Sequence, residues 1–161
     1  MKKGENRPAG VRGFRQRYLP WTMPEGGTIE LPFLDIRLIG PTGRSLITNA
    51  LIDSGATASF VPRNLAQLLK LRYMDSRTTY GAGGKFRAQT SSVIIQYLKN
   101  GVVKGTSADA TVYVPFDDSN IPYSILGRNT VFRAYEILFL ELGQEICLRC
   151  PRKSPAAKRP E

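Results

Sequence analysis

One aspartate stands out as a residue that could do chemistry. The segment 50–57 reads ALIDSGAT, in which an apolar run ends at Asp53 and is followed by Ser54 and Gly55. A carboxylate that leaves an apolar strand is costly unless it is paired or used. Serine can hydrogen-bond the nearby backbone, and glycine permits a tight turn. Asp53 is therefore the candidate catalytic acid.

The composition restricts the chemistry that this acid could perform. The chain has 161 residues and no histidine, which excludes Ser-His-Asp catalysis, Cys-His catalysis and zinc sites that require imidazole. Cys147 and Cys150 form one C-x-x-C pair, whereas a zinc site needs about four ligands, which a dimer could supply. We expect no metal and no cofactor, with Cys147 in the core and Cys150 as a thiol near the tail.

Charge is concentrated at the two ends of the chain. The net charge is +10, of which residues 1–17 carry +5 and residues 149–161 carry +4. Such ends can attract nucleic acid nonspecifically, although they are more often solvated tails. We expect a basic, Gly/Pro-rich arm over 1–27, partly ordered by apolar residues near its end, one domain over 28–148, and a disordered tail over 149–161.

No segment has the properties of a membrane span or a secretion signal. The apolar runs are shorter than the ~20 residues that cross a bilayer, and the basic N-terminus is not followed by an apolar stretch. We expect a cytoplasmic protein with no membrane contact.

The elements that would position Asp53 are predicted to be short strands. Apolar runs between glycine, proline and polar clusters predict about ten strands and one short helix over 65–71, which is typical of a small barrel. Strands over 29–39 and 45–52 would form a hairpin ending at Asp53. Further strands are expected at 59–61, 77–80, 85–90, 92–98, 102–103, 111–114, 123–126, 136–141 and 145–148, with a hairpin turn at 99–101 and one or two helical turns over 128–134.

Two further segments have a spacing that suits the Asp53 turn. The first is glycine-rich and consists of Tyr80, Gly81, Ala82, Gly83 and Gly84. Small residues let two stretches of backbone approach each other closely, and an ordinary glycine-rich turn is the alternative. Phosphate and dinucleotide loops are excluded because Phe86 stands where each needs another residue. The second segment, over 124–129, reads SILGRN.

Taken in order, these three segments resemble the active-site loop, the flap and the supporting strand of the retropepsin-like aspartic protease family. The resemblance implies a mainly β, small closed barrel-like acid protease fold, with one short helix after the strand that supports the active site. It also implies two aspartates that share a proton and activate a water for attack on a peptide bond. Because the chain supplies one Asp-Ser-Gly, the resemblance implies a homodimeric endopeptidase with Asp53 of each subunit at the two-fold axis.

The resemblance assigns roles to neighbouring residues. The active loop beside Asp53 would comprise Ser54, Gly55, Ala56 and Thr57. The supporting segment would comprise Ile125, Leu126, Gly127 and Arg128. In retroviral relatives the arginine at this place pairs with an acid, but Thr57 and Ala58 stand in that region here. The role of Arg128 therefore stays open between an ion pair and an ordinary helix-start residue.

The hairpin expected over 135–148 is long and apolar, and an exposed apolar edge is a liability unless it is covered. We expect part of the dimer interface there, with packing onto the core as the alternative. A second function is also compatible with the sequence: a catalytically inactive module of the same fold for dimerisation or peptide binding, whose basic tails attract nucleic acid. Salt-sensitive nucleic-acid binding without cleavage would favour it.

Overall fold

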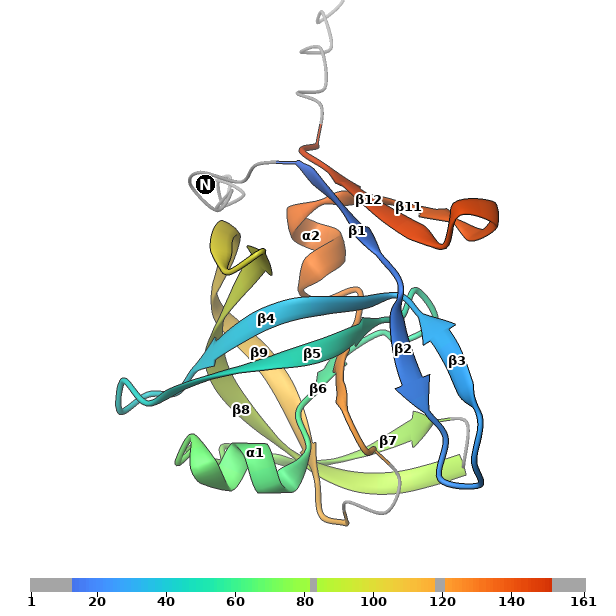
Figure 1. Ribbon diagram of the computed structural model, residues 1–161. Helices are drawn as coiled ribbons and strands as arrows, with labels where there is room; N and C mark the ends of the chain where they lie inside the picture. Colours follow the sequence, from blue (N-terminus) through green and yellow to red (C-terminus); the bar gives the residue numbers. More distant parts are fainter. Residues whose placement is uncertain (1–12, 82–83, 118–120, 152–161) are drawn as a thin grey trace, which may run out of the picture.

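The fold is described from a computed structural model over residues 13–81, 84–117 and 121–151. Figure 1 shows strands wrapped around a core, with two short helices at its surface. Ala82 and Gly83 of the glycine-rich segment lie outside the described residues, as do residues 1–12 of the basic arm and residues 152–161 of the basic tail. Among the described residues, no helix has the length and apolar character needed to span a membrane.

Six strands form a closed ring in the described part of the chain. In order they are β4 (Phe33–Ile39), β5 (Ser45–Ile52), β10 (Ser124–Leu126), β6 (Ser59–Phe60), β9 (Val102–Pro115) and β8 (Gly84–Lys99). β8 pairs with both β9 and β4, and this closes the ring. β7 (Ser76–Gly81) continues the sheet outside the ring by pairing with β8. The predicted mainly β, closed barrel-like fold is confirmed.

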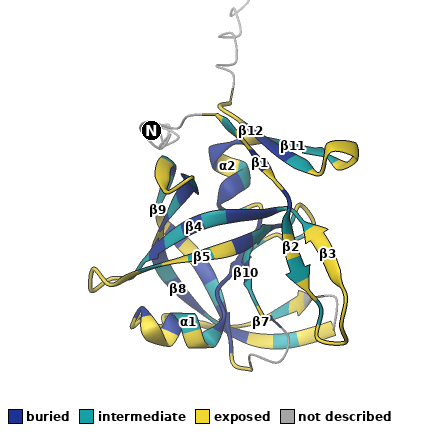
Figure 2. Ribbon diagram, viewed as in Figure 1, coloured by how far each residue is buried: buried dark blue, intermediate teal, exposed yellow. Residues whose placement is uncertain are grey.

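Alternation along the strands decides which side chains enter the core. In β4, Leu34, Ile36 and Leu38 are buried in the core, and the residues between them face outward. β5 buries Ala50 and Ile52 in the same way, and Figure 2 shows this change of burial along the strand. Successive strand residues point to opposite faces of a sheet, so each strand has one core face and one outer face.

β8 and β9 are longer than the sequence predicts. The pattern indicates two shorter strands in place of each, but the structure has single strands of 16 and 14 residues. Backbone pairing continues through the polar stretches and tolerates register shifts within the ladder. The predicted turn between the two strands is confirmed, because Asn100 and Gly101 have φ values of 50° and 75° that suit a two-residue hairpin.

A second, three-stranded sheet joins the two ends of the described chain. β1 (Phe14–Arg17) and β11 (Glu136–Leu140) pair with opposite sides of β12 (Glu145–Arg149), which confirms the predicted terminal hairpin. β2 (Leu19–Thr22) and β3 (Thr28–Leu31) form a separate hairpin. Part of the segment expected as an arm is therefore strand. The division of the chain at residues 27 and 148 stays a prediction.

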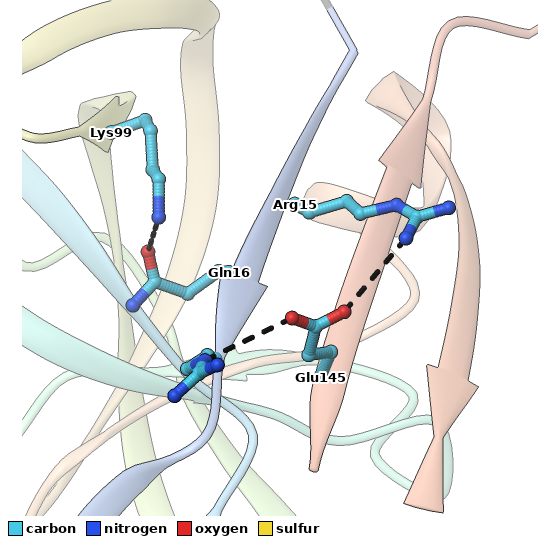
Figure 3. A network of polar contacts seen from close by, with 5 residues as sticks. Arg15, Gln16, Lys99 and Glu145 are labelled. Carbon is cyan, nitrogen blue, oxygen red and sulfur yellow. Dashed lines mark hydrogen bonds and ion pairs between the residues drawn. The ribbon is translucent and has the colours of Figure 1, made fainter. Parts of the chain in front are cut away.

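Polar side chains fasten β1 to its neighbours (Figure 3). Lys99 Nζ, at the end of β8, donates a hydrogen bond of 3.1 Å to Gln16 Oε1. Glu145 lies 3.9 Å from Arg15 and 4.0 Å from Arg17. The arginine side chains are exposed, so these ion pairs contribute little stability, and the strand pairing does more. β1 thus connects the terminal sheet to the barrel.

The two α-helices are short. α1 (Arg63–Leu68) follows Pro62, whose fixed φ suits a helix start. It corresponds to the helix expected over 65–71, but it begins two residues earlier and ends three residues earlier. α2 (Val131–Ala134) follows β10, where one or two helical turns are predicted. Cys147 is buried and Cys150 is exposed, both as free thiols, as expected.

Candidate active site

Asp53 directly follows β5 and begins a tight loop. Its backbone N–H donates to the carbonyl oxygen of Leu126 at 3.1 Å. Its carboxylate Oδ1 accepts from the N–H of Gly55 at 2.8 Å, and its carbonyl oxygen accepts from Ala56 at 3.3 Å. Ser54 and Gly55 are exposed at the turn, while Asp53 is half-buried. The loop therefore holds one carboxylate in a defined orientation at the surface of the barrel.

β10 supports this loop from inside the sheet. It runs parallel to β5, with Leu126 beside Ile52, and antiparallel to β6, with Ile125 beside Phe60. β10 is thus the strand of the ring between β5 and β6, and Figure 2 shows it as largely buried. The structure thus places Ile125 and Leu126 next to the active loop, and Leu126 holds the backbone of Asp53.

Gly127 follows β10 where two chain segments approach each other closely. A Cβ at this position would lie 2.6 Å from the carbonyl carbon of Ala58 and 2.8 Å from the carbonyl oxygen of Ala56, and it would also meet the Ala58 oxygen. Side chains other than hydrogen do not fit beside rigid backbone at such distances. Glycine is required here for close approach.

Arg128 contacts the active loop twice. Its backbone N–H donates to the carbonyl oxygen of Ala56 at 2.9 Å, and its side-chain Nε donates to the carbonyl oxygen of Ser54 at 2.7 Å. The partner of the guanidinium seen here is thus a main-chain carbonyl of the active loop. A charged donor makes a stronger hydrogen bond than a neutral one, so Arg128 restrains the turn that follows Asp53.

A buried hydroxyl network lies behind the loop, and sequence reasoning missed it. Ser59 Oγ accepts the backbone N–H of Gly127 at 2.9 Å and lies 2.6 Å from Thr130 Oγ1. It also donates to Asn129 Oδ1 at 2.9 Å, and Asn129 donates to the carbonyl oxygen of Thr111 at 2.7 Å. A serine at the start of an otherwise apolar strand is the signal that could have indicated it.

An apolar row crosses the outer face of the barrel beside Asp53. Strand register aligns Phe33 with Leu51, Leu51 with Ile125, and Ile125 with Phe60. None of the four belongs to the main core cluster; the two phenylalanines at the ends are buried and the two central members are half-buried. Because Leu51 stands two residues before Asp53, the row forms an apolar floor next to the carboxylate.

Aromatic side chains border this row at both ends. At one end Trp21 lies 5.8 Å from Phe33 and 4.8 Å from Tyr123 between ring centroids. At the other end Phe86, on β8, lies 5.9 Å from Phe60. The central part of the row therefore lies between two aromatic walls.

The β7–β8 hairpin carries the described part of the glycine-rich segment. Gly81 pairs with Gly84, and Thr79 pairs with Phe86, so Thr79 and Phe86 share a face. Tyr80 is on the other face and is 75% exposed. The structure therefore places Phe86, and not Tyr80, toward the apolar row. Among the described residues, no group of three or more His, Cys, Asp or Glu side chains is placed to hold a metal ion.

A family model described as aspartyl protease matches residues 43–130. The matched segment is 88 residues long, more than half of the 161-residue chain, and it includes both Asp53 and Gly127. No protein with a curated description matches the sequence.

Solved structures that can be aligned with this chain include three proteases. A retropepsin-like aspartic protease from Rickettsia conorii has 17% identity and a TM-score of 0.52, covering 86% of this chain and 99% of that one. The EIAV protease bound to an inhibitor has 24% identity and a TM-score of 0.46, with coverage of 64% and 86%. The simian foamy virus protease has 21% identity and a TM-score of 0.40, with coverage of 62% and 90%. The Rickettsia structure supports a retropepsin-like fold, the family model identifies the class of protein, and the chain belongs to the aspartyl protease family.

Proposed function

We propose that the protein is a homodimeric aspartic endopeptidase to which each subunit contributes one Asp53 carboxylate. The observation that carries the proposal is the Asp53 loop itself. It presents one carboxylate at the surface, within a sequence that matches the aspartyl protease family, and Leu126 and Arg128 hold the backbone of the loop. One such carboxylate is half of the acid pair that this chemistry needs.

Two Asp53 carboxylates about 3 Å apart cannot both ionise, so they share one proton. The ionised member takes a proton from a water molecule, which attacks the peptide carbonyl carbon. The protonated member donates to the carbonyl oxygen as negative charge develops there. The reaction needs no metal ion or cofactor.

The substrate is an extended peptide that binds between the active loop and the β7–β8 hairpin as an added strand. Its apolar side chains lie on the row centred on Leu51 and Ile125. Gly55 offers a carbonyl oxygen to the peptide backbone, and Thr57 contacts a side chain. Ala56 keeps the floor of the site narrow, and Ser54 hydrogen-bonds its counterpart across the two-fold axis.

The second subunit docks along β11. β11 and β1 are the two outer strands of the terminal sheet among the described residues. An antiparallel copy of β1 would bring Arg15 and Arg17 against like charges, which is unfavourable. β11 carries Leu138 and Leu140 half-buried on the face opposite to Ile137 and Phe139, which pack against the core. Charge and exposed apolar area therefore both favour β11.

The Asp53→Asn variant tests this function directly. An amide cannot take a proton from water, so we expect cleavage of a peptide library to fall by roughly 10²-fold or more. The Asp75→Asn variant is the matched control, because Asp75 is an exposed acid paired with Arg77 at 3.9 Å. It should cleave as the unchanged protein does.

Equal cleavage by Asp53→Asn and the unchanged protein would contradict the proposal. A folded protein that cleaves nothing but binds nucleic acid in a salt-sensitive manner would instead support the inactive binding module.

A further inference from the structure

Phe116 lies where three elements of the barrel meet. It directly follows β9, and its backbone N–H donates to the carbonyl oxygen of Arg87 on β8 at 3.2 Å. Its carbonyl oxygen accepts from Nη1 of Arg63, the first residue of α1, at 3.2 Å. Both main-chain polar groups of Phe116 are thus used to join β8 to α1.

The ring of Phe116 makes a second set of contacts with the same two arginines. The guanidinium carbons of Arg63 and Arg87 lie over the ring at 5.8 Å and 5.3 Å from its centroid. A cation within about 6 Å of an aromatic face is attracted by the ring quadrupole. An aliphatic side chain of similar size would fill the space but would not attract either cation. The contact therefore depends on the aromatic character of Phe116 and not on its volume alone.

Arg87 stands beside the residue that forms one wall of the apolar row. Its neighbour Phe86 points toward Phe60, and successive strand residues point to opposite faces. β8 is therefore held on both faces at one level: Phe86 contacts Phe60 on one face, and Arg87 contacts Phe116 on the other. Phe60 ends β6, the strand that follows the active loop.

We propose that Phe116 is a positioning residue that fixes the base of the β7–β8 hairpin relative to the active loop. The inference rests on the proposed function, because the hairpin acts on the peptide only if the protein binds one. Loss of the ring contacts frees the Arg87 guanidinium, leaves only backbone hydrogen bonds to hold this level of β8, and lets Phe86 shift from Phe60. Asp53 is held separately through β10, so the change affects peptide binding and not the chemical step.

Three variants separate the electrostatic role of the ring from packing. Phe116→Leu keeps an apolar side chain without the quadrupole, and it should raise KM roughly three- to tenfold while kcat stays within about twofold. Phe116→Tyr keeps an aromatic face and should resemble the unchanged protein. Arg87→Gln should raise KM as Phe116→Leu does, and combining the two should add little. Arg44→Gln, at an exposed position in the turn between β4 and β5, is the control and should leave KM unchanged.

Amide hydrogen exchange over residues 84–88 gives a second readout that does not require activity. Exchange there should be faster in Phe116→Leu than in Phe116→Tyr, with exchange in β4 and β5 unaffected. Equal exchange and equal KM in all variants would overturn the proposal, as would the same change in the Leu and Tyr variants. If the unchanged protein cleaves nothing, the proposed protease function fails, and the exchange comparison still decides whether Phe116 positions the hairpin.

Discussion

Gly127 sets how closely β10 can approach the loop that carries Asp53. The backbone of residues 56–58 lies directly against the Gly127 Cα. This contact allows the Arg128 N–H to reach Ala56 and the Gly127 N–H to reach Ser59. A side chain at this position would push apart two segments that are both fixed by hydrogen bonds.

We expect Gly127→Ala to destabilise the fold by about 3 kcal/mol, because its Cβ would overlap main-chain atoms that cannot rotate away. Urea unfolding of the variant and the unchanged protein measures the difference. Gly143→Ala is the matched control, since a Cβ at Gly143 meets nothing within 4 Å. Similar unfolding midpoints for Gly127→Ala and Gly143→Ala would contradict this prediction. They would mean that the backbone of residues 56–58 moves away from the new Cβ at little cost in free energy.

Single residues of the site differ in how far the sequence could predict them. Asp53 and Gly127 could be identified because each stands in a short motif whose residue types the chemistry or the packing requires. The partner of Arg128 could not, because it is the carbonyl oxygen of Ser54, and a main-chain acceptor leaves no trace in residue identity. The role of Ser59 could not be predicted for a related reason. Its hydroxyl accepts a hydrogen bond from the N–H of Gly127, which is far away in sequence, and no local sequence pattern indicates this contact.

At the level of elements, β8 and β9 are joined inside the barrel by a tyrosine. The hydroxyl of Tyr97 lies 2.6 Å from Ser107 Oγ on β9, and the ring is fully buried. Burial raises the pKa of Tyr97 from 10 to about 12, while hydrogen bonds with Ser107 and Thr130 act in the opposite direction. The folded state therefore favours the neutral hydroxyl.

The raised pKa of Tyr97 predicts a loss of stability at alkaline pH. Its contribution is fully present below pH 10, where both states are neutral, and it is lost as pH rises from about 10 to 12 because only the unfolded chain ionises. The free energy of unfolding should fall by roughly 1–3 kcal/mol more in the unchanged protein than in Tyr97→Phe across this range. Tyr80→Phe is the control, because Tyr80 is exposed. Parallel pH curves for all three proteins would contradict the assignment.

The elements that the sequence predicted well are those with local signals. β5 has the predicted bounds because an apolar run ends at an acid and a glycine, and the turn at Asn100 has its own residue preference. The sequence predicts two short strands in place of each of the long strands β8 and β9, because polar residues interrupt the apolar pattern. Backbone hydrogen bonds between strands do not depend on side-chain type, so the pairing continues through these residues. β1 was not predicted as a strand because its partner, β12, lies at the other end of the chain.

At the scale of the whole molecule, the proposed function requires a dimer in which both subunits carry an intact Asp53. In mixtures of the unchanged protein with Asp53→Asn, each inactive subunit disables the dimer that it joins. After subunit exchange at constant total concentration, an equal mixture should retain about one quarter of the activity, because about one quarter of random dimers carry two intact subunits.

Retention of about one half would mean that each chain acts alone. Sedimentation of the same samples should show a dimer in both pure proteins and in the mixture. A monomer with full activity at every concentration would contradict the two-chain site.

The place of β10 between β5 and β6 also sets when the site can form. Both flanking strands leave the ribosome long before the strand that joins them. Until residues 124–128 emerge, the Asp53 N–H has no Leu126 acceptor and the Ser54 carbonyl has no Arg128 donor. Contacts so distant in sequence form late in folding. The order of synthesis therefore delays assembly of the Asp53 loop until most of the barrel has been made, and under the proposed function this keeps a growing chain from cleaving itself or its neighbours.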